Sequence, residues 1–286
     1  MKLQTTVSFP PSRIGIRPDD RILVLGSCFA DQVGVRMLQA GFQACVNPFG
    51  TLYNPFSLAS ALSRLCDGRP FTESECVEMG AGADLVCSFS HHTSFARPTQ
   101  EEFLDHANRS LEEAADFWRD CNKAVLTLGT VFCWLHDGAV AANCLKRPAS
   151  EFERVEMNLE QVTAVLRGIV LSSPGKEFIF TVSPVRHLGD GAHLNQLSKS
   201  TLLLAVDALL RDPAVGQRCE YFPAYEIMMD ELRDYRFYAE DMTHPTAQAA
   251  DYIWERFVEF AVPAEDKARI AAAEKAWKAA RHRPLH

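Results

Sequence analysis

A serine stands where a predicted strand meets a predicted helix. Residues 21–25 form a short apolar run, typical of a buried strand in a parallel sheet, and Gly26 and Ser27 follow it. Apolar residues then recur at helical spacing over residues 28–39. The N–H groups at the start of such a helix carry a partial positive charge, which suits an attacking hydroxyl and the oxyanion it generates. Ser27 is therefore a candidate nucleophile, and the simpler interpretation is that it only caps the helix.

An aspartate and a histidine three residues apart form the second candidate group, Asp241 and His244. They precede a helix that we expect over residues 245–260, with Pro245 at its first position. At this spacing the carboxylate can orient the imidazole while the ring accepts a proton from a nucleophile. Taken alone, the spacing more often marks a helix cap beside a surface histidine, so its weight comes from its combination with Ser27.

The elements that must position these residues alternate between strand and helix, which predicts a three-layer α/β/α fold with a mostly parallel sheet. The ligand site of such a sheet lies beyond the carboxyl ends of its strands. The expected strands are residues 21–25, 42–46, 85–89, 124–128, 178–182 and 219–222, with a hairpin over residues 131–142. The expected helices are residues 28–39, 56–65, 101–118, 152–171, 194–210 and 245–260.

One main domain is expected over residues 21–262. A polar N-terminal extension, residues 1–20, precedes it, and residues 68–98 have the weaker pattern of an inserted segment or flap. Residues 263–286 are expected to hold a C-terminal helix that packs on the domain through an apolar stripe of Ile270, Ala273 and Trp277.

Composition narrows the classes of function. The 286 residues include 29 Lys and Arg against 37 Asp and Glu, and the resulting charge of −8 does not attract phosphate backbones or anionic lipid. Nucleic acid and membrane partners are therefore not expected. The sequence has no apolar run near the roughly 18 residues of a membrane-spanning helix and no apolar core of a signal peptide, so we expect a cytoplasmic location.

Metal and disulfide chemistry find little support in the sequence. The nine cysteines are scattered without a C-x-x-C pair. The neighbouring His91 and His92 lack an acid or a cysteine at ligand spacing, so we interpret them as loop histidines. No metal and no cofactor are expected.

Several further motifs accompany the two candidate groups. Residues 25–30 read LGSCFA, and the others are NPFGTLYNP at 47–55, LGT at 128–130, TVSPVRH at 181–187, SKS at 198–200 and YFPAYE at 221–226. Gly-Ser after the first strand, together with D-x-x-H before the last major helix, resembles the SGNH/GDSL hydrolase superfamily. More specifically, residues 26–30 resemble the motif that names the GSCFA family. The resemblance covers roughly residues 21–260.

The resemblance implies a serine acyl-ester hydrolase, or an acyl transferase, that uses neither metal nor cofactor. Ser27 would be the nucleophile, His244 the general base and Asp241 the group that orients it, with a covalent acyl-enzyme as the intermediate. The superfamily completes its oxyanion hole with the N–H of a glycine, matched here by Gly50, and with the amide of an asparagine.

This sequence departs from the superfamily at the asparagine of the oxyanion hole, because residues 128–131 read LGTV and hold no G-x-N. Asn54 or Thr130 could take its place. Arg186 and His187 lie at another strand end, where the arginine suits either a substrate carboxylate or a salt bridge to a nearby acid. By analogy with the superfamily, a small-molecule or glycan acyl ester is the expected substrate.

Two alternatives stay open. Cys28 lies at the same helix N-terminus, where a thiol becomes more reactive, and could act with His244 as a thiol acyl transferase. Against this, the residue at a strand-to-helix turn usually faces the site, whereas the next residue turns toward the helix or the core. The second alternative is a non-catalytic binding protein on the same fold, which would not need Ser27, Asp241 and His244 together.

Overall fold

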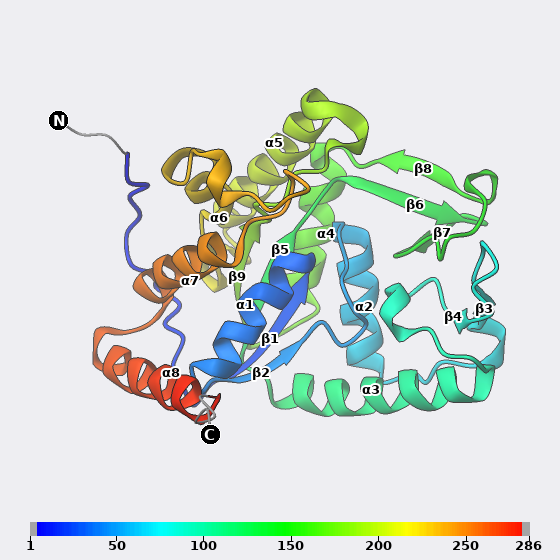
Figure 1. The fold of residues 1–286 in the computed structure, drawn as a ribbon, viewed down its shortest axis with the longest axis horizontal. Helices are drawn as coiled ribbons and strands as arrows, with labels where there is room; N and C mark the ends of the chain where they lie inside the picture. Colours follow the sequence, from blue (N-terminus) through cyan, green and yellow to red (C-terminus); the bar gives the residue numbers. More distant parts are fainter. Residues whose placement is uncertain (1–4, 282–286) are drawn as a thin grey trace, which may run out of the picture.

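The computed structural model describes residues 5–281, and a five-stranded parallel sheet lies at its centre (Figure 1). The strand order is β10-β9-β5-β1-β2, which is the doubly wound arrangement that reverses direction between β1 and β5. This order confirms the predicted parallel sheet. The strands are β1 (Arg21–Gly26), β2 (Gln43–Val46), β5 (Lys123–Leu128), β9 (Glu177–Val182) and β10 (Cys219–Tyr221).

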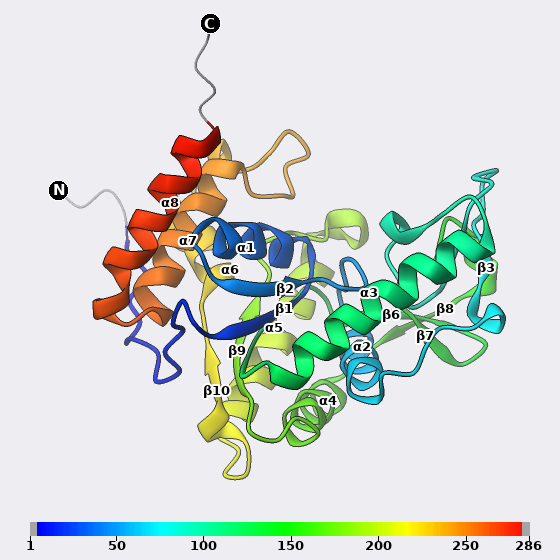
Figure 2. The same ribbon diagram turned by 90° about the horizontal axis from the view of Figure 1, so that it is seen from below.

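Helices cover both faces of this sheet, as Figure 2 shows. Alternate residues of β1 face opposite ways: Ile22 and Val24 pack into one core, and Leu23 and Leu25 into the other. The first core is closed by α1 (Cys28–Gln39), α7 (Ala247–Ala261) and α8 (Lys267–Arg281). The second is closed by α2 (Pro55–Asp67), α3 (Gln100–Asp120), α4 (Leu159–Leu171) and α5 (Gly191–Leu210). The three-layer α/β/α prediction is confirmed at this level.

Two caps fix where the helices next to the site begin. The Ser27 side chain accepts the N–H of Phe29 at the start of α1. Asn54 accepts the N–H of Ser57 at the start of α2, where Pro55 occupies the first turn. Both caps therefore place their residues at the carboxyl edge of the sheet.

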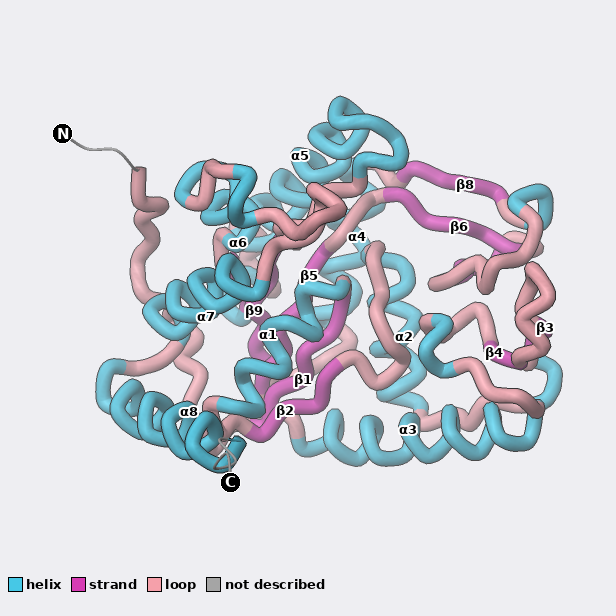
Figure 3. The backbone as a smooth tube through the Cα atoms, in the orientation of Figure 1, coloured by secondary structure: helices cyan, strands magenta, loops and turns pink. Residues whose placement is uncertain are grey.

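A small antiparallel sheet stands beside the central one, as the separate strands in Figure 3 show. The predicted hairpin is confirmed as β6 (Phe132–His136) and β7 (Ala139–Ala141). The prediction of one helix over residues 152–171 is wrong at its start, because β8 (Glu153–Glu156) pairs with β6 and α4 begins only after the Asn158 cap. The guanidinium of Arg154 stacks on Phe132 across this pair, 4.0 Å from the ring centroid.

The predicted inserted segment, residues 68–98, contains one short antiparallel pair. Its strands are β3 (Val77–Glu78) and β4 (Val86–Cys87), so the strand expected at 85–89 is shorter than predicted. His91 and His92 lie in a loop, as predicted, and His91 is fully buried there among phenylalanine rings. This segment packs against α3.

The C-terminal helices differ in detail from the prediction. Helix α7 begins at Ala247 after a Thr246 cap, and Pro245 lies before the cap, where it bridges to Tyr238. Helix α8 packs on the domain through Ile270, which is 2% exposed. Trp277 is 43% exposed and so does not belong to the buried stripe. Residues 1–4 of the predicted extension and residues 282–286 lie outside the described part of the chain.

Gly26 has no room for a side chain. Its φ is +142°, and an added Cβ would lie 2.2 Å from the carbonyl oxygen of Thr127. We expect Gly26→Ala to lower the free energy of unfolding by about 3 kcal/mol or more, because the clash meets backbone and cannot relax by a rotamer change. The measurement is urea denaturation.

Gly168→Ala is the matched control, because nothing lies within 4 Å of its added Cβ on α4. We expect this change to raise stability by about 0.5–1 kcal/mol. Equal effects of the two substitutions would contradict the close β1–β5 approach.

Candidate active site

The turn that joins β1 to α1 is held from both sides. On one side the N–H of Gly26 donates to Oδ1 of Asn47 at 2.9 Å, and Asn47 in turn donates to Asp31 at 2.6 Å. On the other side the N–H of Ser27 donates to Oγ1 of Thr127 at 3.0 Å. Asn47 directly follows β2 and Thr127 lies in β5, so these hydrogen bonds tie the turn to the strands on both sides of β1.

The Ser27 hydroxyl is buried against this support. Ser27 is 1% exposed, and its Oγ lies 3.2 Å from Oγ1 of Thr127. The same oxygen accepts the N–H of Phe29 at 3.3 Å. Ser27 therefore has the geometry of a buried cap.

Cys28 is the residue of this turn that lines the pocket at the sheet edge. From the sequence, Ser27 is expected at the site and Cys28 turned away, whereas Cys28 is among the residues that line this pocket and Ser27 is not. Cys28 is partly exposed, whereas Ser27 is 1% exposed. The Ser27 hydroxyl is in contact with the hydroxyl of Thr127.

Asp241 and His244 form the pair that the sequence predicts. Oδ2 of Asp241 lies 2.5 Å from Nδ1 of His244, and Oδ1 accepts the backbone N–H groups of Thr243 and His244, each at 2.9 Å. A carboxylate can only accept, so Nδ1 carries the hydrogen and Nε2 keeps a lone pair. The histidine is thereby prepared to act as a base through Nε2.

Arg186 secures the loop that carries this pair. Its side chain donates to the carbonyl of Met242, and its N–H donates to the carbonyl of Thr243 at 3.1 Å. The guanidinium also lies 4.1 Å from the centroid of the Tyr238 ring. Within residues 5–281 it forms no salt bridge with a nearby acid, and its contacts hold this loop in place.

One pocket brings the candidate residues together. It has a volume of about 520 Å³ and lies at the carboxyl edge of the sheet, next to the small antiparallel sheet. Cys28 and His244 line it, as do Asn54 from the loop before α2 and Trp134 and Arg154 from β6 and β8. A thiol, a base and an amide thus share one cavity.

The three expected oxyanion residues have different surroundings. The N–H of Gly50 donates to the carbonyl of Asn47 at 2.7 Å, and Gly50 lies outside the pocket. The N–H of Thr130 donates to the carbonyl of Tyr53 at 2.9 Å. Asn54 lines the pocket, and its Oδ1 accepts the N–H of Ser57 at the start of α2. Its Nδ2 makes no hydrogen bond within residues 5–281. Of these three residues, Asn54 is the one whose side-chain N–H groups have no partner within residues 5–281.

Comparison with known proteins supports one family. The chain matches the family model described as the GSCFA family over residues 21–257, which is most of its length. This chain belongs to the GSCFA family. The comparisons with curated proteins and with solved structures gave no significant match.

His187 is a neutral wall of the pocket of this GSCFA protein. Its N–H donates to Oδ1 of Asn195 at 2.9 Å, and its ring meets Tyr53 edge to face. Burial, with smaller contributions from Lys199 and His244, lowers the pKa of His187 to about 4. The ring is therefore uncharged at neutral pH and does not attract an anionic group.

Opposing influences act on the Cys28 thiol of the GSCFA protein. Burial, and to a smaller extent the charge of Asp31, raise its pKa. The N–H groups of Cys28 and Phe29 and the charge of Lys199 act in the opposite direction. Because the net pKa is raised, the resting group is the thiol, and a base must remove its proton before attack.

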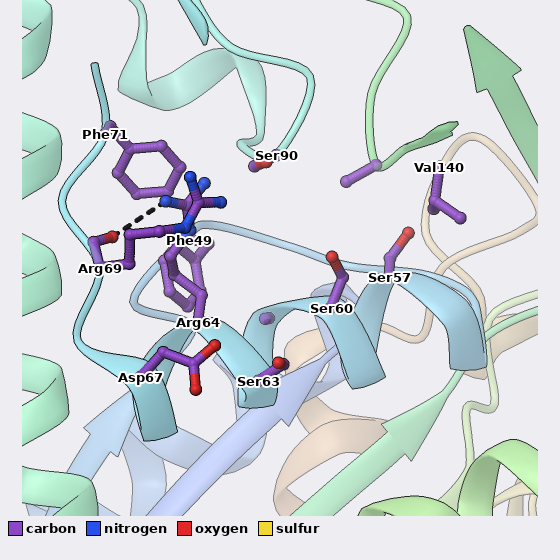
Figure 4. A pocket seen from close by; sticks show the side chains of 12 residues that line it. Phe49, Ser57, Ser60, Ser63, Arg64, Asp67, Arg69, Phe71, Ser90 and Val140 are labelled. Atoms are coloured by element: carbon purple, nitrogen blue, oxygen red, sulfur yellow. Dashed lines mark hydrogen bonds between the residues drawn. The ribbon is translucent and has the colours of Figure 1, made fainter. Parts of the chain in front are cut away.

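A second cavity, shown in Figure 4, lies between α2 and the inserted segment. Its volume is about 140 Å³, and three serines of α2, Ser57, Ser60 and Ser63, line it. Arg64 also lines it and donates to the carbonyl of Arg69. Asp67 lies beside Ser63 on the wall of this cavity, and its lining residues include no histidine. Among residues 5–281 no three His, Cys, Asp or Glu side chains gather where they could hold a metal ion.

Several supporting residues are not evident from the sequence alone. Thr127 lies inside a predicted strand and belongs to none of the motifs. It supports the turn after β1 because its Oγ1 contacts the N–H and the hydroxyl of Ser27. Asn47 and Lys199 both lie in segments that resemble the family, and that resemblance was the only available signal. Trp134 and Arg154 reach the pocket through the β6–β8 pairing, which local patterns do not reveal.

The hydrogen bonds around His244 make Asp241 an unusually strong acid. The hydrogen bonds from the N–H groups of His244 and Thr243, and then from the His244 ring, hold its pKa well below the ordinary 3.8. The stabilisation that it provides to the loop is therefore present above about pH 3.8 and is lost as the pH falls through the lower folded value. We expect a ¹³C NMR titration of the Asp241 carboxyl to show a midpoint clearly below that of ordinary aspartates.

His244→Ala should move this midpoint upward, because one of the hydrogen bonds to the carboxylate disappears. Asp234, which accepts the N–H of Arg236 at 2.9 Å, serves as the internal reference. An Asp241 midpoint at or above the ordinary value would contradict the geometry of the pair.

Proposed function

We propose that this GSCFA protein is an acyl-ester hydrolase or acyl transferase that reacts through a thioester on Cys28. The observation that carries the proposal is that Cys28 shares a pocket with His244, whereas the Ser27 hydroxyl is buried against Thr127. The position of the nucleophile after β1 and of the Asp-His pair before α7 also supports an arrangement of SGNH type.

The chemical steps follow from the orientation of the groups. Nε2 of His244 takes the proton of the Cys28 thiol as sulfur attacks the ester carbonyl, and Asp241 stabilises the resulting imidazolium. The tetrahedral intermediate collapses with cleavage of the C–O bond, and the leaving alkoxide takes the proton from His244. Water or an acceptor hydroxyl then loses its proton to His244, attacks the thioester and releases the Cys28 thiol.

Charge on the tetrahedral oxygen needs donors aimed at it. The N-terminus of α1 offers backbone N–H groups at Cys28, and Asn54 offers the Nδ2 of its side-chain amide. Each donor of this kind typically contributes about 3 kcal/mol to transition-state stabilisation. Asn54 thus takes the part that the missing G-x-N motif leaves open.

The walls of the pocket favour a compact neutral substrate. Trp134 and Phe132 offer aromatic surface, while Arg154 is already paired with Asp190 and stacked on Phe132. His187 is uncharged at neutral pH. These groups suit a small-molecule or glycan acyl ester better than a strongly anionic one.

The chemistry also bears on location. A thioester mechanism needs a reduced cysteine, and the nine cysteines are all free thiols. The reducing cytoplasm would keep these cysteines as thiols, and we propose that the protein is cytoplasmic. No helix among residues 5–281 combines the length and apolar character needed to cross a membrane.

The test is a comparison of three variants in hydrolysis of p-nitrophenyl acetate and in transfer of its acetyl group to glycerol. We expect Cys28→Ala and His244→Ala each to lower kcat/KM by about 10³-fold or more, because both take part in forming the thioester. Ser27→Ala should lower it by about tenfold at most, because it removes only a cap and a contact to Thr127.

Circular dichroism and urea denaturation of each variant provide the control for folding. A large loss in Ser27→Ala with full activity in Cys28→Ala would assign the reaction to the serine and overturn the proposal. Unchanged rates in all three variants would point instead to a binding protein.

A further inference from the structure

The cavity between α2 and the inserted segment has no part in the proposed reaction, and we call it the α2 cavity (Figure 4). Three serines of α2, Ser57, Ser60 and Ser63, line it on one side, and Ser90 lies on the other. Its volume is about 140 Å³. Because a cavity of about 150 Å³ can hold a six-atom ring, the α2 cavity has room for a ligand of about that size.

The hydroxyl of Ser57 is a buried group without a partner. Ser57 is 3% exposed, and its Oγ makes no hydrogen bond within residues 5–281. Its backbone N–H is already used, because it donates to Oδ1 of Asn54 in the α2 cap. An unpaired buried hydroxyl costs stability. Since Ser57 lines the cavity, the partner that its hydroxyl lacks has to come from the cavity.

Arg64 is a fixed donor on the wall of the same cavity. Its side chain is 9% exposed, and its guanidinium lies 4.0 Å from the centroid of the Phe71 ring. Nη1 donates to the carbonyl oxygens of Arg69 at 2.9 Å and Pro70 at 3.3 Å, and Nη2 donates to Glu75. No hydrogen bond within residues 5–281 uses its Nε. Arg64 is thus held in place and still has an N–H group to donate.

The charges around the cavity balance. Arg64 is paired with Glu75, whose Oε1 also lies 3.8 Å from Nη2 of Arg69. Asp67 lines the cavity as well. Two guanidinium groups are thus matched by two carboxylates, so the cavity has no excess positive charge with which to hold a phosphate or sulfate ion.

Apolar surface lies beside these polar groups. The rings of Phe49 and Phe71 line the cavity, and so do Ala61 and Val140. Water or an inorganic oxyanion makes only polar contacts and leaves such surface without an apolar partner. A ligand that carries both C–H and O–H groups matches the aromatic rings and the serine hydroxyls together.

We propose that the α2 cavity binds a compact, uncharged ligand with several hydroxyl groups, of about the size of glycerol. Its hydroxyl groups pair with Oγ of Ser57 and Nε of Arg64, and its C–H groups lie against Phe49 and Phe71. The inference does not depend on the proposed function, because the residues of the proposed reaction do not line this cavity.

The experiment follows the alanine methyl groups of the ¹³C-labelled, otherwise unaltered chain by NMR during a titration with glycerol. Ala61 lines the α2 cavity but not the reaction pocket, whereas Ala142 lines both. Ala115 lines a third cavity and serves as the reference. We expect a saturable shift of the Ala61 methyl signal and at most a linear drift of the Ala115 signal.

Ser57→Ala tests the hydroxyl itself. We expect it to weaken glycerol binding by about tenfold, because one hydrogen bond to the ligand is lost. Ser173→Ala is the matched control and should leave the affinity unchanged. Ser173 is 2% exposed, its Oγ also has no partner within residues 5–281, and it lines the same third cavity as Ala115. Circular dichroism of both variants checks their folding.

Other outcomes would overturn the proposal. The absence of a saturable shift at Ala61 would show that the cavity holds only water. A saturable shift with inorganic phosphate and none with glycerol would show an anion site instead. A saturable shift at Ala142 without one at Ala61 would place glycerol in the reaction pocket. An unchanged affinity in folded Ser57→Ala would show that the Ser57 hydroxyl does not bind the ligand.

Discussion

The hydrogen bonds that clamp the turn after β1 are the constraint on which the site depends. Asn47 holds Gly26 from the β2 side, and Thr127 holds Ser27 from the β5 side. These hydrogen bonds lie between β1 and β5, where the strand order changes direction. The helices that follow the two strands cover opposite faces of the sheet, which leaves a crevice at the carboxyl ends of the strands. With the Ser27 hydroxyl held below, the first residue of α1, Cys28, is the one that enters that crevice.

The other parts of the site are held to the same edge by separate anchors. Arg186 fastens the loop of Asp241 and His244 to the end of β9. Lys199 of α5 connects the ends of β5 and β9, because its Nζ donates to the carbonyl oxygens of Gly129 and Ser183. Each anchor joins residues far apart in the sequence, which lets loops form a defined site on a rigid sheet.

The sequence predicts the frame of this fold better than the orientation of its side chains. The five parallel strands and the bounds of α1 follow from local apolar patterns, and the structure confirms them. The strand β8 was missed because its stability comes from pairing with β6, which no local pattern encodes. Ser27 is buried against Thr127, which lies a hundred positions away, so spacing alone does not show which of residues 27 and 28 lines the pocket.

The most direct test of the central claim is to locate the acyl group on the protein. The protein is incubated with p-nitrophenyl acetate, quenched in acid and mapped by peptide mass spectrometry, with half of the sample treated with neutral hydroxylamine. That reagent cleaves a thioester and leaves a serine ester intact, so it separates Cys28 from Ser27 even within one peptide. We expect an acetylated peptide containing residue 28 whose added mass hydroxylamine removes. A hydroxylamine-resistant acetyl group on Ser27 would contradict the account.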